Sequence, residues 1–205
     1  MIKIENIEVF NIARAVYSAR NALNSWAKSD SNLKEDILGE NDLNLAMRLA
    51  NAGSDDRKFL RQISVVMDVT APFYWWKEAD QYKVGTVTNS CSTMHKIHSK
   101  EVTIADFSSE KLDESGIQLL NATIDYLNRN REMFLETKDK TYWYNMIQML
   151  PTSYNQLRTI TLNYEVLKNM YHARKNHKLD EWKAFCKVIE DMPYSCLITG
   201  AGKTE

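Results

Sequence analysis

The stretch around residue 95 carries the side chains whose types and spacing most directly suggest chemistry. Cys91, His95 and His98 are spaced i, i+4 and i+7, so on a helix they would share one face and offer a thiolate and two imidazoles to zinc. The sequence shows no fourth ligand and no second pair of cysteines beside them. Ordinary packing and hydrogen bonding explain this spacing better, and we expect no metal site.

Two other patterns suggest anion binding. The final Gly-Ala-Gly-Lys-Thr-Glu looks like a phosphate loop, but that motif requires a glycine five positions before Gly202, where Leu197 stands. We therefore expect no phosphate loop there. Arg57, Lys58 and Arg61 form a basic cluster that is either an anion-binding group or a solvated turn. The sequence leaves these two interpretations open.

Composition excludes several classes of partner. The 205 residues carry 26 Lys and Arg against 27 Asp and Glu, so no global field draws the chain to nucleic acid or to an anionic membrane. The three cysteines are odd in number and widely spaced, which indicates a reducing compartment. The chain has no long apolar run that would cross a membrane. We expect a cytoplasmic protein with no nucleic-acid and no membrane partner.

The elements that must position these side chains are mostly helices. Apolar spacing predicts an α+β protein with a small mixed or antiparallel sheet, whose strands lie at residues 2–10, 59–69 and 157–162. Helices are predicted over residues 13–27, 43–52, 73–83, 112–137, 138–149, 164–175 and 179–191. Asn41-Asp42 would cap the second of these helices, and Gly53 would end it. Because no linker-like segment or repeat interrupts the chain, we predict a single domain over residues 1–205.

The chain contains Ala71-Pro72 followed by Gln81-Tyr82-Lys83, and Leu150-Pro151 followed by Asn163, Asn169 and Arg174. Within roughly residues 55 to 192, these two groups resemble motifs of the flavin-dependent thymidylate synthases. In that family an Ala-Pro precedes a helix that leads into Arg-His-Arg-x7-Ser. Here Ala71-Pro72 is followed by Gln81-Tyr82-Lys83, seven residues and then Cys91. Downstream, the family's Leu-Pro and its Asn-x3-Leu-x-Asn/His-x4-Arg pattern match without a gap at Leu150-Pro151, Asn163, Leu167, Asn169 and Arg174.

The resemblance implies roles for these residues and partners for the chain. Asn163 and Asn169 would contact a flavin, and Arg174 would contact the phosphate or base of dUMP. The family fold is the α+β fold of the thymidylate-synthase-complementing proteins, assembled as a homotetramer with pockets at subunit interfaces. The implied cofactor is FAD, and an active enzyme would also use NADPH and methylene-tetrahydrofolate.

The chain departs from the family pattern where the family places charge. Gln81 and Lys83 replace the arginine pair and Tyr82 replaces the histidine, while Asn89 and Thr93 replace a substrate-contacting glutamate and arginine. Each lost charge-assisted contact with a phosphate costs about 1.5–3 kcal/mol. We therefore expect weaker dUMP binding unless Lys83 or the basic cluster compensates, and weak or absent flavin binding.

Two further departures lie elsewhere in the chain. Ile147 stands where the family has another arginine, and Arg61 falls near the family's flavin-side glutamate. We expect the flavin side of the pocket to include Asn163, Asn169, Tyr82 and Arg61, and the substrate side to include Arg174, Lys83, Gln81, Asn89 and Glu78.

Cys91 and Arg174 each keep two interpretations. Cys91 replaces a serine near the substrate, so a thiolate activated by Lys83 or His95 would be a catalytic nucleophile toward C6 of a pyrimidine. The alternative is a near-isosteric replacement of the hydroxyl. Arg174 extends the apolar face of its helix and needs an anionic partner, which is either a ligand or an acid such as Glu78 or Asp80.

These residues predict a protein of this fold that binds a dUMP-like pyrimidine nucleotide, with methyl transfer left open. One alternative is an active FAD-dependent thymidylate synthase that converts dUMP to dTMP. A second alternative is a non-catalytic, oligomeric interaction or inhibitory protein.

Overall fold

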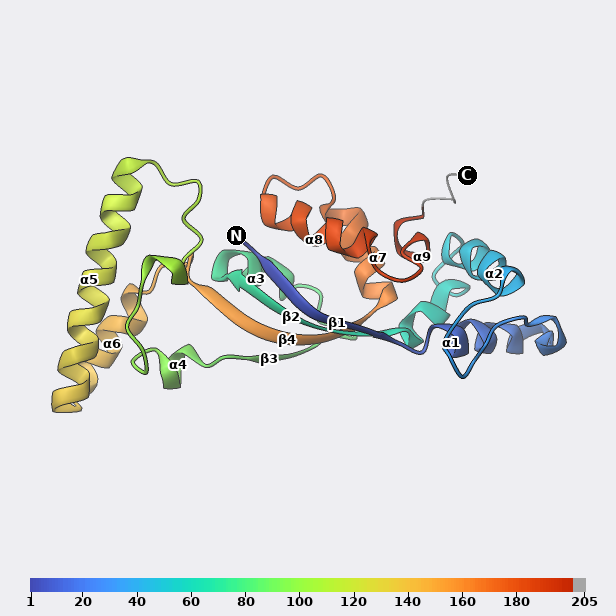
Figure 1. The fold of residues 1–205 in the computed structure, drawn as a ribbon, viewed down its shortest axis with the longest axis horizontal. Coiled ribbons are helices and arrows are strands. Elements are labelled where there is room, and N and C mark those ends of the chain that lie inside the picture. Colours follow the sequence, from blue (N-terminus) through green and yellow to red (C-terminus); the bar gives the residue numbers. More distant parts are fainter. Residues whose placement is uncertain (201–205) are drawn as a thin grey trace. The chain divides into compact units, whose positions relative to one another are not determined.

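The computed structural model describes residues 1–200 and contains a four-stranded antiparallel sheet with the order β1-β2-β4-β3 (Figure 1). Its strands are β1 Lys3–Phe10, β2 Ser64–Pro72, β3 Val87–Ser90 and β4 Asn155–Asn163. The helices are α1 Ile12–Ala19, α2 Glu40–Ala50, α3 Phe73–Ala79, α4 Thr93–Lys96, α5 Glu114–Thr137, α6 Lys140–Met149, α7 Tyr164–Arg174, α8 Asp180–Glu190 and α9 Cys196–Thr199. The predicted helix-dominated α+β class is confirmed.

The chain divides into two compact units. Unit 1 consists of Met1–Lys3, Val69–Gln81 and Asn89–Arg158, and unit 2 consists of Ile4–Asp68, Tyr82–Thr88 and the chain from Thr159 onward. The prediction of a single domain over residues 1–205 stays a prediction. None of the helices in residues 1–200 is long and apolar enough to cross a membrane.

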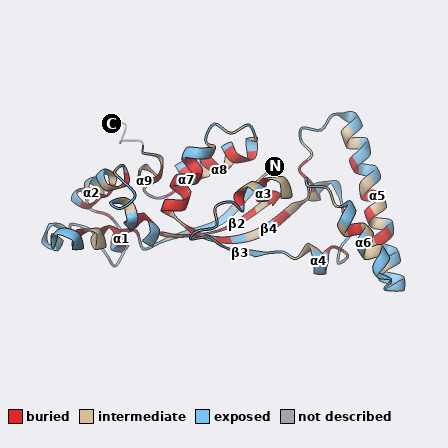
Figure 2. Cartoon of the chain, turned by 180° about the vertical axis from the view of Figure 1, so that it is seen from behind, coloured by how far each residue is buried: buried red, intermediate tan, exposed pale blue. Residues whose placement is uncertain are grey.

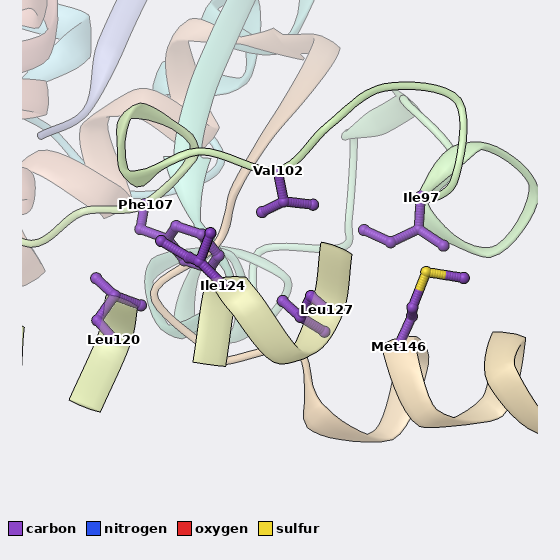
Figure 3. Close-up of a cluster of buried hydrophobic side chains, with 7 residues drawn as sticks. All are labelled: Ile97, Val102, Phe107, Leu120, Ile124, Leu127 and Met146. Atoms are coloured by element: carbon purple, nitrogen blue, oxygen red, sulfur yellow. The ribbon is translucent and has the colours of Figure 1, made fainter. Parts of the chain in front are cut away.

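Unit 1 has its core where α5 packs beside α6 (Figure 1). The side chain of Asp113 caps α5 by accepting from the Gly116 N–H at 2.8 Å. Figure 3 shows the buried cluster of this core. Helix α5 contributes Leu120, Ile124 and Leu127 from one face, and α6 contributes Met146. The chain before α5 contributes Ile97, Val102 and Phe107. Ile147, where the resembling family has an arginine, packs against this cluster instead.

Unit 2 has its core around α7, which Figure 2 shows as buried over most of its length. Tyr164 and Leu167 of α7 are fully buried, as is Trp182 of α8. The short helix α9 adds two more buried side chains, Leu197 and Ile198. Helix α7 positions the residues that the family pattern singled out, because its buried face sets the direction in which every other side chain of the helix points.

Three predicted boundaries were wrong in physically informative ways. The helix predicted over residues 13–27 ends at Ala19, because the chain tightens into 3₁₀ turns at Arg20–Leu23 and Trp26–Lys28 and Asn24 takes a left-handed conformation. The strand predicted from residue 59 begins at Ser64. Phe59 and Leu60 are adjacent and both buried, which suits the 3₁₀ turn they occupy rather than an alternating strand. The helix predicted to residue 83 ends at Ala79.

Helix α2 is also capped differently from the prediction. Its N-cap is Gly39, and the carboxylate of Asp30 accepts from the backbone N–H of Asn41 at 2.8 Å and of Asp42 at 3.1 Å. A Cβ on Gly39 would lie 2.3 Å from Cγ of Asp30, so the glycine is what allows this close approach.

Asp42 is the centre of a buried ion pair instead of a cap. Its side chain is fully buried, and it accepts from Arg20 Nε at 2.6 Å and from the hydroxyls of Ser29 and Ser31 at 2.5 and 2.6 Å. Burial opposes ionisation of Asp42, but the hydrogen bonds from Ser29, Ser31 and Arg20 outweigh it and hold the pKa of this carboxyl below its ordinary 3.8.

We expect Asp42→Ala to lower the free energy of unfolding by about 3–5 kcal/mol, because it leaves Arg20 buried without its carboxylate. The exposed Asp55→Ala is the control and should change little. Because the folded pKa of Asp42 is depressed, its contribution is present above the unfolded pKa and is lost as the pH falls through the folded one. Urea unfolding at several pH values measures both effects, and equal stabilities for the two variants would refute the assignment.

Candidate functional site

The junction of β4 and α7 positions the residues that the sequence assigned to the flavin side. Asn163 is the N-cap of α7, and its side-chain oxygen accepts from the Val166 N–H at 3.0 Å. The other end of the carboxamide faces Gly85, where a Cβ would lie 2.7 Å from Asn163 Nδ2. Gly85 also has a φ of +78°, so two constraints require glycine at this position.

A cavity of about 450 Å³ in unit 2 lies at this junction. It is lined by Arg61, Val84, Gly85, Asn163, Glu165, Val166 and Asn169. The structure thus brings three of the four residues predicted for the flavin side, Arg61, Asn163 and Asn169, around one cavity. The fourth, Tyr82, does not line it, and the flavin role of these residues stays a prediction. The volume of the cavity is within the range of small-molecule sites, which is about 300–1,000 Å³.

Glu165 is the residue of this cavity that sequence reasoning missed. Its side chain is only 10% exposed, and Arg57 Nε donates to its Oε1 at 3.1 Å. Its Oε2 is buried and has no hydrogen-bond partner within residues 1–200. An acidic residue in the first turn of a helix is ordinary, so no pattern in the sequence marks Glu165 as functional.

The basic cluster at residues 57–61 does not act as one anion-binding group. Arg57 is paired with Glu165, Arg61 lines the cavity, and Lys58 is exposed beside a different hollow of unit 2. Lys168 is buried next to this pair, and its Nζ donates to the carbonyl oxygens of Leu197 and Ile198. Burial and the charge of Arg57 lower the pKa of Lys168, and Glu165 opposes that shift.

Arg174, at the end of α7, is held against aromatic rings. Its Nε donates to the Tyr82 hydroxyl at 3.0 Å, and its guanidinium carbon lies 5.0 Å from the ring centroid of Trp182. Tyr82, which stands where the family has histidine, therefore fixes the orientation of the arginine. Asp80, one of the acids predicted as an alternative partner, pairs with Arg158 at 2.9 Å.

In unit 1, Cys91 lies on the wall of a second cavity of about 830 Å³. Its side chain is exposed, and its backbone is held on both sides. The Cys91 N–H donates to the Leu157 carbonyl at 3.0 Å, and Gln156 Nε2 donates to the Cys91 carbonyl at 2.7 Å. Ser92, Thr93 and Lys96 line the same cavity.

A second layer of unit 1 holds Gln156 in place. Arg158 Nε donates to Gln156 Oε1 at 2.9 Å, and its guanidinium carbon lies 4.2 Å from the ring centroid of Trp76. The indole N–H of Trp76 donates to the Gln156 carbonyl at 3.0 Å. The buried indole, the arginine and the glutamine thus form a rigid support for the backbone at Cys91.

The zinc-like spacing does not produce one helical face. Helix α4 covers only Thr93–Lys96, so Cys91 precedes it and His98 follows it, packed edge-on to Phe134. Within residues 1–200, no three His, Cys, Asp or Glu side chains gather in a way that would hold a metal ion.

The remaining predicted substrate-side residues are divided between the two units. Glu78, Gln81 and Asn89 belong to unit 1, where Gln81 and Asn89 are exposed and Glu78 is half-buried. Lys83 belongs to unit 2 and is exposed. The phosphate-loop-like end of the chain lies mostly outside the described residues.

Comparison with known proteins gives a match in structure and not in sequence. No family model and no curated protein sequence matches the chain. The structure of a flavin-dependent thymidylate synthase ThyX from Helicobacter pylori, complexed with FAD and dUMP, superimposes with a TM-score of 0.70 at 17% identity, covering 97% of this chain and 100% of that chain.

A second ThyX structure from the same organism, with FAD and dUMP, also has a TM-score of 0.70 at 17% identity and covers 98% of both chains. The UMP/dUMP methylase PolB from Streptomyces cacaoi, bound with 5-Br dUMP, follows at a TM-score of 0.64 and 13% identity, covering 93% of this chain and 88% of its own. The chain therefore has the fold of the flavin-dependent thymidylate synthases, as the sequence resemblance predicted.

Proposed function

We propose that the protein is a divergent ThyX-like protein that binds a pyrimidine nucleotide of the dUMP class. The observation that carries this proposal is the cavity at the β4–α7 junction, which gathers Arg61, Asn163 and Asn169 in a fold whose solved examples hold FAD, dUMP or 5-Br dUMP. A cytoplasmic location is part of the same proposal.

Arg174 is the residue we assign to the anionic part of the nucleotide. A guanidinium offers a planar set of donors that suits a phosphate, and it loses less freedom on binding when it is already oriented. The hydrogen bond to Tyr82 and the contact with the Trp182 ring supply that orientation. Lys83 is exposed and would add a point charge.

The residues of the unit 2 cavity also fit the ring of a flavin. Asn163 Nδ2, Asn169 and Arg61 would hold its polar edge. A bound flavin supplies hydride-transfer chemistry. Arg61 is the one cation among the described residues that line this cavity, so we propose weaker FAD binding than an arginine-rich pocket would give.

Methyl transfer from methylene-tetrahydrofolate to dUMP, with NADPH and FAD, is the second candidate function. It is favoured by the position of Cys91 on the wall of the unit 1 cavity beside Ser92, Thr93 and Lys96. A third candidate is a non-catalytic oligomeric protein, which would bind no nucleotide. Formation of dTMP by the purified protein with these three cofactors distinguishes the second candidate from the other two.

Replacement of Arg174 should weaken nucleotide binding while the fold stays intact. We expect Arg174→Ala to weaken dUMP binding by about 10- to 100-fold, the loss of a charge-assisted contact. Lys83→Ala should weaken it less, because a point charge gives no bidentate geometry. Calorimetric titration with dUMP, alongside melting curves, measures this, and equal affinity in all three proteins or an unfolded Arg174→Ala would sink the assignment.

Cys91 has a readout that requires no cofactor. If its thiolate adds to C6 of dUMP, a sulfur–carbon bond forms, C5 takes a proton from solvent, and reversal returns a C5 proton to solvent. In D2O the wild-type protein should therefore exchange the C5 hydrogen of dUMP, and Cys91→Ser should not. Proton NMR of dUMP follows this exchange. Identical behaviour of the two proteins would leave the sulfur as an isosteric replacement for a hydroxyl.

We propose a homotetramer because two helices of unit 1 expose large apolar side chains. Helices α5 and α6 expose large apolar side chains, notably Leu119 at 70%, Tyr144 at 53% and Met149 at 51%. We expect light scattering at micromolar concentration to give about four times the mass of one chain. Leu119→Glu should lower that mass, while Asp125→Lys, an exposed change on the same helix, should not. A wild-type mass equal to one chain would contradict the proposal.

A further inference from the structure

The buried carboxylate of Glu165 is the feature that the proposed function leaves unexplained. Glu165 lines the unit 2 cavity, and its side chain is only 10% exposed. Its Oε2 has no hydrogen-bond partner within residues 1–200. A buried acceptor without a partner is rare in native proteins and calls for an explanation.

The neighbouring cations do not supply that partner. Arg57 donates through Nε to the other oxygen, Oε1, at 3.1 Å. Lys168 directs its Nζ to the carbonyl oxygens of Leu197 and Ile198 at 3.4 and 3.3 Å. Glu165 is therefore anchored at one oxygen, and its second oxygen is a buried acceptor without a partner within residues 1–200, in a residue that lines the cavity.

The rest of the cavity is rich in donors. Asn163 uses its side-chain oxygen to cap α7, so its Nδ2 is the end that remains for a ligand. Asn169 and Arg61, whose side chains carry a carboxamide and a guanidinium, line the same cavity. The donors suit the carbonyl oxygens of a ligand, and the single buried acceptor suits an N–H that lies between them.

We propose that Glu165 determines which ring this cavity accepts, by taking a hydrogen bond from the N–H of a cyclic imide. The inference rests on the proposed function and names the chemistry of its ligand. Uracil and the isoalloxazine ring of a flavin both carry an imide, with an N3–H between two carbonyl groups. Cytosine has a lone pair at N3, which would face a buried carboxylate and be rejected.

Glu165→Gln is the variant that inverts this selection. Arg57 Nε donates to Oε1, so the amide oxygen should keep that position and the amide NH2 should replace Oε2. The cavity would then present a donor where the wild type presents an acceptor. Glu190→Gln is the matched control, because it makes the same change in a carboxylate that pairs with Lys187 outside the cavity.

The test compares ligands that differ at N3. Calorimetry measures binding of dUMP, N3-methyl-dUMP and dCMP, and fluorescence quenching measures binding of riboflavin and 3-methylriboflavin. We expect wild type and Glu190→Gln to lose about 10- to 100-fold in affinity on N3 methylation of the ring that the cavity holds. Glu165→Gln should lose this sensitivity, and the dUMP-over-dCMP preference should fall or reverse.

The two ligand pairs identify the source of the imide. Sensitivity in the nucleotide pair assigns the cavity to a uracil ring, and sensitivity in the riboflavin pair assigns it to a flavin; either supports the inference. Binding of dUMP or riboflavin by wild type with no effect of N3 methylation overturns the inference and leaves the proposed function standing. No binding of any of these compounds overturns both. The methylated ligands test wild type directly, so the result does not depend on the folding of Glu165→Gln.

Discussion

The carboxamide of Asn163 holds together the part of unit 2 on which the candidate site depends. Its oxygen caps α7 and so fixes where the helix begins, and its Nδ2 abuts Gly85 in the loop between Tyr82 and Thr88. The start of the helix sets the rotation at which Glu165 and Asn169 line the cavity and at which Arg174 leaves the last turn. The loop in turn carries Tyr82, whose hydroxyl holds Arg174.

Several cationic residues of this chain lie at positions other than those in the motif of the flavin-dependent thymidylate synthases. Where an arginine and a histidine were expected, Gln81 and Tyr82 stand, and Tyr82 orients an arginine instead of adding a cation. Arg57 is committed to Glu165, and Arg158 is committed to Asp80 and to the ring of Trp76. Arg61 is the one cation among the described residues that line the unit 2 cavity, which favours a small ligand held by hydrogen bonds over a polyanion held by arginines.

The sequence was informative where a signal is local. The start of α7 after Asn163 follows from a cap residue and helical periodicity, and the long helix α5 follows from its apolar stripe. Strand β3 was missed because all four of its residues are exposed, so it has no alternation to detect. The cap of α2 was misassigned because the N-cap residue is Gly39 and the carboxylate that accepts from the first turn, Asp30, lies in a preceding loop.

The candidate site divides in the same way. Asn163 and Asn169 were predicted from their match to a family pattern and Arg61 from its place near a family glutamate, and the structure gathers all three around one cavity. Glu165 was not found, since its pairing with Arg57 spans 108 residues and no local pattern encodes it. The need for glycine at position 85 likewise arises only from its positive φ and from the approach of Asn163.

Nucleotide binding at the β4–α7 junction is tested most directly by observing this junction while a nucleotide is added. In ¹⁵N–¹H TROSY spectra, we expect the backbone amide of Gly85 and the side-chain amides of Asn163 and Asn169 to shift in a saturable way with dUMP. Resonances of the α5–α6 core, such as Leu127, should stay in place. If saturating dUMP moved none of the junction resonances, this cavity would not be a nucleotide site.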